Sequence, residues 1–400
     1  MAERIRELEA VVVRNLRRFK DAYFTNTVTR DETLPVKEQQ IMGLLDNLPV
    51  NLQFFIMTFL SPADLCRLGS TSRYWRAMVR DPLLWKYFLL RDVPSWPSID
   101  HLSMPNLELL ESPLLSEDEP LHDEDEEEEE EEEERKIDFM SEYLRGCPSC
   151  RNHVIPSRPV YQVMTSFLHS LVPSSEPRYA MFGPGMEQLE VSLVKRMMFA
   201  PDVLPVSGTP HRQINGIGSG ISYMFNNQHR FNILTLYTTN RAERERAREQ
   251  QQQEGINNKL FNCVGNDASG FPVFTPAPQV QEVCEVVDGF IYVANAEPGK
   301  GEEKTEVAQI RAMLNCRRGS SSKPLLVLAC VSREEPVMDQ RDGSDRARAR
   351  TPCVYVAKRL NLPQISHCWM VQDTVAESLS GLLDGISWLL KCSGVKLHGS

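Results

Sequence analysis

The chain has 400 residues, 41% of them hydrophobic, which is enough length and apolar material for two folded domains. Its formal net charge of −11 has a local origin: residues 117 to 134 hold fifteen acidic groups, and taking these away from −11 leaves +4 for the rest. This pattern disfavours direct nucleic-acid binding, and no apolar run is long enough to span a membrane. The N-terminus has no apolar signal-peptide region and the ten cysteines follow no repeating spacing, so we expect reduced thiols in a cytoplasmic or nuclear protein.

Residues 1–43 form the first predicted segment, and its opening part has the periodicity of an amphipathic helix. Ile5, Leu8, Val12 and Leu16 lie along one face, and Arg and Glu side chains occupy the other. A stripe of this kind needs a partner. We expect it to drive self-association into a homodimer; the alternative is that it packs on the segment that follows.

Residues 44–92 form a series of short helices that carry an excess of apolar side chains. Leu48-Pro49 opens the first helix, because proline suits a first helical position. Ser61-Pro62-Ala63-Asp64 restarts the chain as a second helix, with Ser61 as its N-cap. The apolar positions of the two helices recur at helical spacing: Leu52, Ile56, Phe59 and Leu65. A unit this small cannot bury all of them, so some must contact another part of the chain or another protein.

This segment resembles an F-box, since it follows the pattern L-P-x-x-L, I-x-x-x-L, D-L-x-x-L, S-R-x-W and L-W in order. Asn51 stands where that pattern usually has an acidic residue, at a solvated position. The resemblance implies docking onto the Skp adaptor of a cullin–RING ubiquitin ligase. The residues that we expect to contact the adaptor are Leu48, Pro49, Leu52, Ile56, Phe59 and Leu65.

Residues 93–157 form a predicted helical linker, interrupted by an acidic insert at 116–135. A block of like charges repels itself, so we expect this insert to be disordered. Cys147-Pro148-Ser149-Cys150, with His153, supplies only part of a zinc site, because zinc takes four ligands and no second pair lies nearby. We therefore expect no metal.

From residue 158 to 395 the sequence pattern changes: short apolar runs alternate with segments of helical periodicity. The runs are RYAMFG, ISYMF, FNILTLY, GFIYVANA, PLLVLACVS and ISHCWMV. Strands that are apolar along their whole length suit a sheet covered on both faces, and their alternation with helices predicts a mostly parallel α/β sheet.

The first of these strands leads into a Gly-containing turn and a helix, which is where a phosphate-binding loop would lie. A working loop needs a lysine and a hydroxyl, whereas Gly183-Pro184-Gly185 is followed by Met186 and Glu187. No D-x-x-G follows FNILTLY, and no N-K-x-D follows PLLVLACVS. The sequence thus predicts neither a nucleotide cofactor nor a catalytic site.

The last part of the chain, WMVQDTVAESLSGLLDGISWLL, resembles the small GTPases of the ADP-ribosylation-factor-like group. Together with the F-box, most of residues 44–390 is similar to F-box substrate receptors whose second domain has an atypical small-GTPase-like fold. This resemblance implies a multidomain chain: an all-α F-box part, followed by an α/β substrate-binding domain. It implies a non-enzymatic receptor subunit whose substrates include D-type cyclins and a telomeric-repeat-binding factor. The alternative is a nucleotide-regulated GTPase-like switch fused to an F-box.

One further predicted helix is a candidate for substrate binding. Pro352 opens it, and Cys353 and Ala357, four residues apart, are two small side chains on one face. Spacing alone favours packing of this face on the chain's own sheet. The resemblance implies instead that it receives the telomeric-repeat-binding factor, and we expect Cys353 and Ala357 to contact substrate.

Overall fold

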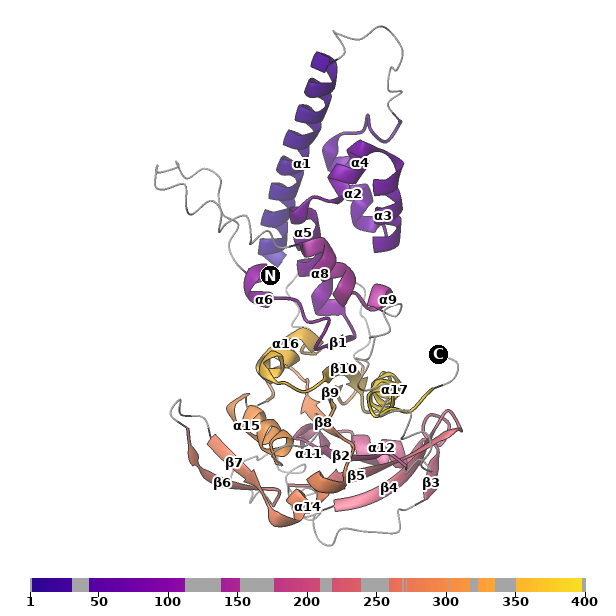
Figure 1. Cartoon of the computed structure of the whole chain (residues 1–400), viewed down its shortest axis with the longest axis vertical. Helices are drawn as coiled ribbons and strands as arrows, with labels where there is room; N and C mark the ends of the chain where they lie inside the picture. Colours follow the sequence, from indigo (N-terminus) through magenta and orange to yellow (C-terminus); the bar gives the residue numbers. More distant parts are fainter. Residues whose placement is uncertain are drawn as a thin grey trace. The chain divides into compact units, whose positions relative to one another are not determined.

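The computed structural model in Figure 1 contains two units. The described residues are 2–30, 43–111, 138–151, 176–208, 218–238, 259–267, 270, 272–301, 303–316, 323–334 and 350–397. The helical unit comprises residues 1–95 and 105–155, and the α/β unit comprises residues 96–104 and 156–400. The predicted acidic insert at 116–135 and His153 lie outside the described residues.

The helical unit is all-α, as the sequence predicted. Its elements are α1 (Ala2–Arg30), α2 (Val50–Phe59), α3 (Pro62–Thr71), α4 (Arg73–Val79), α5 (Pro82–Asp92), the short 3-10 helix η2 (Val93–Ser95), α6 (Leu107–Glu111), α8 (Phe139–Gly146) and α9 (Pro148–Arg151). No helix in the described part of the chain is long and apolar enough to cross a membrane.

Side-chain caps define the short helices of this unit. The Ser61 hydroxyl accepts a hydrogen bond from the Asp64 amide at 3.2 Å, so the predicted N-cap is confirmed. Ser72 and Asp81 cap α4 and α5 in the same way. Pro49 lies one position earlier than predicted: it is the N-cap residue of α2, and the helix begins at Val50.

The apolar stripe of α1 packs inside the helical unit. Leu8, Val12 and Leu16 are all buried, and α1 lies against α5, α2 and α4. Polar contacts reinforce this position: Lys20 Nζ donates to the Asp46 carbonyl oxygen at 2.7 Å. The assignment of self-association to this stripe is therefore wrong, because the chain's own helices cover it, although Ile5 is only half-buried. The alternative, packing on the following segment, describes the structure.

The α/β unit is built on an eight-stranded sheet, in the order β1-β10-β9-β8-β2-β5-β4-β3. Its strands are β1 (Ser98–Asp100), β2 (Arg178–Phe182), β3 (Val206–Gly208), β4 (Gly218–Phe225), β5 (His229–Leu236), β8 (Gly289–Asn295), β9 (Leu325–Val331) and β10 (Trp369–Val375). The five central strands from β10 to β5 are parallel, whereas β1, β3 and β4 pair antiparallel. The predicted fold class, a helical part followed by a mostly parallel α/β domain, is confirmed.

Helices cover this sheet on both faces. They are α11 (Gly185–Gln188), α12 (Leu193–Phe199), α14 (Pro278–Val286), α15 (Glu303–Leu314), α16 (Cys353–Arg359), the 3-10 helix η3 (Leu362–Gln364) and α17 (Leu382–Cys392). Alternate residues of the central strands, such as Ile291 and Val293 of β8, form one core cluster with α12 and α17. Tyr292, between them, points the other way and donates to Glu306 of α15 at 3.1 Å.

Two parts of the chain differ from the prediction. Residues 96–104, expected in the linker, belong to the α/β unit, where β1 pairs antiparallel with β10 through Ile99 opposite Val371. Outside the six predicted apolar runs, the chain also forms a separate hairpin of β6 (Phe261–Asn266) and β7 (Pro272–Pro276). The linker prediction missed β1, and the six predicted strands did not include β6 or β7.

A charge on the buried face of α1 tests its packing. Val12 is fully buried, so Val12→Asp should lower the free energy of unfolding of the helical unit by about 3 kcal/mol or more. Ala10, exposed on the same helix, is the matched control, and Ala10→Asp should cost less than about 1 kcal/mol. Urea unfolding, with light scattering of the folded proteins, measures both. A Val12→Asp protein as stable as the parent, but with half its mass, would restore the self-association assignment.

Candidate functional site

The exposed face of α2 is the clearest apolar surface that the described residues of the helical unit leave uncovered. Leu52, Phe55 and Phe59 are 48%, 58% and 73% exposed and lie three and four residues apart, so they share one side of the helix. The rings of Phe55 and Phe59 meet edge to face with centroids 4.8 Å apart. Leu44 and Leu45, which precede the helix, are also exposed. We call Leu44, Leu45, Leu52, Phe55 and Phe59 the α2 face.

The opposite side of α2 is fixed by buried contacts, which determine the side that faces outward. Gln53 is fully buried; its amide nitrogen donates to the Leu45 carbonyl oxygen at 2.8 Å and its side-chain oxygen accepts from the Tyr74 hydroxyl at 2.6 Å. Phe54 packs edge to face on Tyr87 of α5, with centroids 5.2 Å apart. Rotating α2 to hide the α2 face would expose Phe54 and break the hydrogen bonds of the Gln53 side chain.

The structure separates the predicted adaptor residues into three groups. Leu52, Phe59 and Pro49 are exposed, and Leu48 and Ile56 are half-buried beside them. Leu65 is 1% exposed, so its assignment to an adaptor surface is wrong: it is a core residue of α3. Phe55 was missed, because Phe54, Phe55 and Ile56 are consecutive and periodicity alone does not say which of them faces outward.

In the α/β unit, the turn after β2 is where a phosphate-binding loop would lie. The polar side chain of this turn forms hydrogen bonds within the chain. The Glu187 carboxylate accepts from the Thr238 amide at 2.7 Å and from the Thr238 hydroxyl at 2.6 Å. Gly183 has φ +122°, and a Cβ there would lie 2.6 Å from the Val293 carbonyl oxygen. The turn thus packs on β8, with a carboxylate in place of the cation that phosphate requires.

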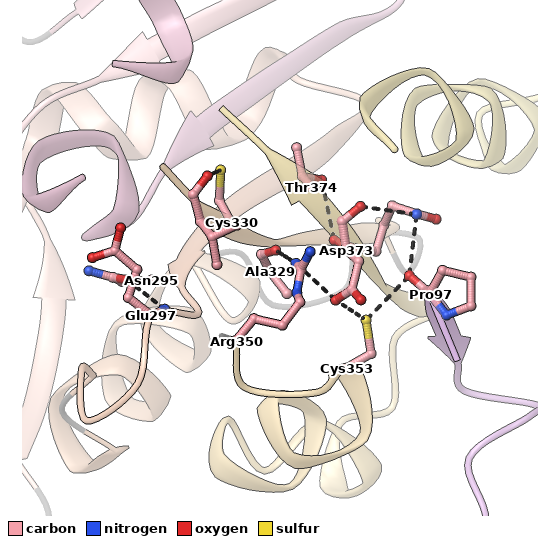
Figure 2. Close-up of polar contacts among 11 residues, drawn as sticks. Pro97, Asn295, Glu297, Ala329, Cys330, Arg350, Cys353, Asp373 and Thr374 are labelled. Atoms are coloured by element: carbon pink, nitrogen blue, oxygen red, sulfur yellow. Dashed lines mark hydrogen bonds and ion pairs between the residues drawn. The ribbon is translucent and has the colours of Figure 1, made fainter. Parts of the chain in front are cut away.

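The carboxyl ends of the parallel strands are the usual ligand edge of an α/β sheet, and here internal polar contacts close that edge. Figure 2 shows Arg350 reaching between β9 and β10, where it donates to the Ala329 carbonyl oxygen at 2.5 Å and pairs with Asp373 at 3.0 Å. Glu297, which follows β8, accepts from the Ser332 hydroxyl at 2.6 Å. Burial raises the pKa of Asp373, and the Arg350 charge opposes that rise.

The predicted substrate residues Cys353 and Ala357 lie in this closed region. Cys353 is 1% exposed, and its thiol donates to Asp373 at 2.9 Å, while Ala357 is fully buried. Burial, with the Asp373 carboxylate beside it, raises the pKa of the Cys353 thiol well above its usual range. The assignment of both residues to a substrate-contacting surface is therefore wrong. Their small side chains let α16 pack on β10 and β1, as spacing alone favoured.

Cys147 and Cys150 lie close together around the start of α9, where both contact the Ser149 hydroxyl, at 3.1 and 3.9 Å. Among the described residues, no group of three or more His, Cys, Asp or Glu side chains could hold a metal ion. Burial raises the pKa of Cys150, which favours its protonated thiol. The two cysteines do not form a metal centre with any other described residue.

Comparison with known proteins places these features in a family. Residues 45–91 match the F-box-like family. F-box only protein 4 of Bos taurus is 48% identical to this chain over 350 residues, which are 87% of this chain and 83% of the relative. F-box only protein 4 of Homo sapiens is 44% identical over 387 residues, 96% of this chain and 92% of the relative.

Among solved structures, the Arl6 small GTPase of Trypanosoma brucei, determined with a bound nucleotide analogue, covers 55% of this chain and 98% of its own chain. The identity is 11% and the TM-score 0.29, so this alignment adds nothing to the strand order described above. The relatives, in contrast, match most of both sequences at 44% and 48% identity. The chain therefore belongs to the F-box only protein 4 family.

Proposed function

We propose that the chain is the substrate-recognition subunit of an Skp–cullin–F-box ubiquitin ligase complex, and that the α2 face binds the Skp adaptor. The observation that carries the proposal is the α2 face itself, an apolar surface held outward on a helix whose other side is locked in the core. The F-box-like match at residues 45–91 and the family membership support the same role.

The chemistry of this surface suits a stable protein contact. Aromatic side chains dominate interface energetics, and Phe55 and Phe59 already form an ordered pair that loses little side-chain freedom on binding. Pro49, Leu48 and Ile56 extend the same surface along the start and side of α2. The half-buried members add contact area, and the two phenylalanines supply the anchors.

Such a subunit performs no bond chemistry. It raises the effective concentration of the substrate near a catalytic centre that another subunit carries. The proposal includes D-type cyclins and a telomeric-repeat-binding factor as substrates and a cytoplasmic or nuclear location. Support for the substrates comes from the resemblance and the family membership. Cys353 and Ala357, being buried, are no longer proposed as substrate contacts.

The rival function, a GTPase-like switch, is disfavoured by particular contacts. Glu187 accepts a hydrogen bond from Thr238 at the position of the phosphate loop. Arg350 forms an ion pair with Asp373 and a hydrogen bond with the Ala329 carbonyl oxygen at the edge of the sheet. A nucleotide would have to break these bonds and then meet a carboxylate where it needs a cation.

The first test concerns the adaptor. Phe59→Ala should weaken binding of purified Skp adaptor by about 2 kcal/mol or more, roughly 30-fold in Kd, because truncating a central aromatic anchor has costs of this size. Phe199, on α12 of the α/β unit, is the matched control: it is 76% exposed against 73% for Phe59. Phe199→Ala should bind the adaptor like the parent. Equal affinities for all three proteins, measured by calorimetry, would refute the assignment of the α2 face.

A second test separates substrate binding from adaptor binding. The parent should retain purified D-type cyclin or telomeric-repeat-binding factor in a pull-down, and Phe59→Ala should retain it equally, because the proposal gives Phe59 to the adaptor. Loss of a substrate in Phe59→Ala, with the fold verified by circular dichroism, would show that the α2 face serves the substrate. Retention of neither substrate by the parent would refute the substrate assignment.

A third test addresses the rival. Titration of GDP and Mg²⁺ into the full chain should give no binding heat, since missing charged hydrogen bonds cost several powers of ten in affinity. A nucleotide-binding small GTPase titrated under the same conditions is the positive control. A Kd of about 1 μM or tighter for the chain would favour the switch.

A further inference from the structure

We propose that Cys147 and Cys150 form a reversible disulfide with each other when the chain meets a low-molecular-weight disulfide such as oxidised glutathione. In the structure both are free thiols, at the junction of α8 and α9 in the helical unit. The proposed receptor function uses neither of them, and they form no metal centre with any other described residue. The inference therefore stands apart from the adaptor and the substrate.

The backbone of the junction brings the two cysteines together. The Cys147 carbonyl oxygen accepts from the Cys150 amide at 3.0 Å and from the Arg151 amide at 2.9 Å, so residues 147–150 form one tight turn. The Cα atoms at the two ends of such a turn lie within about 7 Å of each other. A disulfide joins Cα atoms about 4.4–6.8 Å apart, so the backbone is already close to the spacing that the bond needs.

The two thiol groups gather around one atom. The Ser149 hydroxyl oxygen lies 3.1 Å from the Cys147 sulfur and 3.9 Å from the Cys150 sulfur. Both sulfurs are therefore on the same side of the turn, as expected for residues three apart in helical backbone. Rotation of the cysteine side chains past the Ser149 hydroxyl then brings the sulfurs into bonding contact.

Contacts of α8 hold this turn in place. The Cys147 amide donates to the Tyr143 carbonyl oxygen at 2.8 Å, which ties the turn to the end of α8. Tyr143 is itself buried: its hydroxyl donates to Asp92 at 2.7 Å, and its ring lies 5.3 Å from that of Trp85. Cys147 is thus fixed beside Cys150, which raises the effective concentration of one thiol near the other.

Exposure decides which thiol reacts first. Cys150 is half-buried, whereas Cys147 is only 6% exposed, so a reagent in solution reaches Cys150. Burial, together with the neighbouring Cys147, raises the pKa of Cys150. This slows its reaction near neutral pH, because the thiolate is the nucleophile. At equilibrium the same shift favours the disulfide, since no stabilised thiolate holds the pair in its reduced form.

The exchange has two steps. The Cys150 thiolate attacks one sulfur of oxidised glutathione, a mixed disulfide forms, the sulfur–sulfur bond of the reagent breaks and one glutathione thiolate leaves. The Cys147 thiolate then attacks the Cys150 sulfur and displaces the second glutathione thiolate. The two protons lost by the cysteines pass through solvent to the two leaving thiolates. The protein dithiol is oxidised by two electrons, and oxidised glutathione is reduced to two thiols.

The experiment equilibrates the full chain with buffers of oxidised and reduced glutathione, blocks the remaining thiols with N-ethylmaleimide and identifies tryptic peptides by mass. Trypsin cleaves after Arg145 and Arg151, so both cysteines lie in the peptide 146–151. The disulfide form of this peptide lacks two hydrogen atoms and carries neither N-ethylmaleimide nor glutathione. Cys66 and Cys263, which are exposed, report the reaction of single thiols in the same chain.

With reduced glutathione at about 1 mM, the pair should be half-oxidised at a ratio of oxidised to reduced glutathione about tenfold or more below the ratio that half-modifies Cys66 or Cys263. The reason is that the second thiol acts at a millimolar or higher effective concentration. In concentrated urea, which removes the turn, several-fold less of the disulfide should form at the same ratio.

Two variants separate the members of the pair. In Cys147→Ser, Cys150 should keep glutathione as a mixed disulfide and need the same ratio as the reference thiols, because no second thiol displaces it. Cys66→Ser is the matched control: it also removes one thiol of the helical unit, and it should leave oxidation of the peptide 146–151 unchanged.

The proposal is overturned if the peptide 146–151 of the folded parent keeps both thiols, or carries glutathione, at ratios that half-modify Cys66 and Cys263. A disulfide from Cys150 to any cysteine other than Cys147 would also overturn it. So would equal or greater formation of the disulfide in urea, because the folded turn would then contribute nothing.

Discussion

The buried hydrogen bond between Tyr74 and Gln53 fixes the rotation of α2, and with it the surface that the helical unit presents. Burial raises the pKa of Tyr74 to about 12, so its hydroxyl remains a neutral donor to the Gln53 side chain. Both groups would lose a partner in a dry interior if α2 turned, a cost of about 1–3 kcal/mol for each unsatisfied group. Leu52, Phe55 and Phe59 therefore stay outward, where none of the described residues of the unit covers them.

The helical unit leaves an apolar surface open, whereas the α/β unit closes its ligand edge with polar contacts. Arg350 with Asp373, Glu297 with Ser332, and Glu187 with Thr238 are all contacts within one chain, at the places where an α/β sheet of this order would hold a ligand. The chain's own side chains thus occupy the edge of the sheet where a ligand would bind. A receptor that holds one protein and presents another needs such a scaffold and has no need of a bound nucleotide.

Much of this architecture could be predicted from the sequence. Six apolar runs predicted six strands of the sheet, and the Ser61 cap predicted the start of α3, because strand burial and capping are local properties. β1 could not be predicted, since three residues between prolines form a strand only through pairing with β10, some 270 positions later. Leu65 was misassigned for a related reason: periodicity identifies a face, and tertiary packing decides what covers it. For Cys353 and Ala357, spacing alone favoured the buried packing that the structure has, and the family resemblance led to their wrong assignment to the substrate.

The central claim is that the α2 face lies against the adaptor in the complex, and side-chain footprinting measures this directly. Hydroxyl radicals oxidise exposed phenylalanine, and Phe55, Phe59 and Phe199 are all exposed in the chain alone. On addition of purified Skp adaptor, oxidation of Phe55 and Phe59 should fall sharply while that of Phe199 stays unchanged. Unchanged oxidation of Phe55 and Phe59 in a complex verified by its mass would contradict the account.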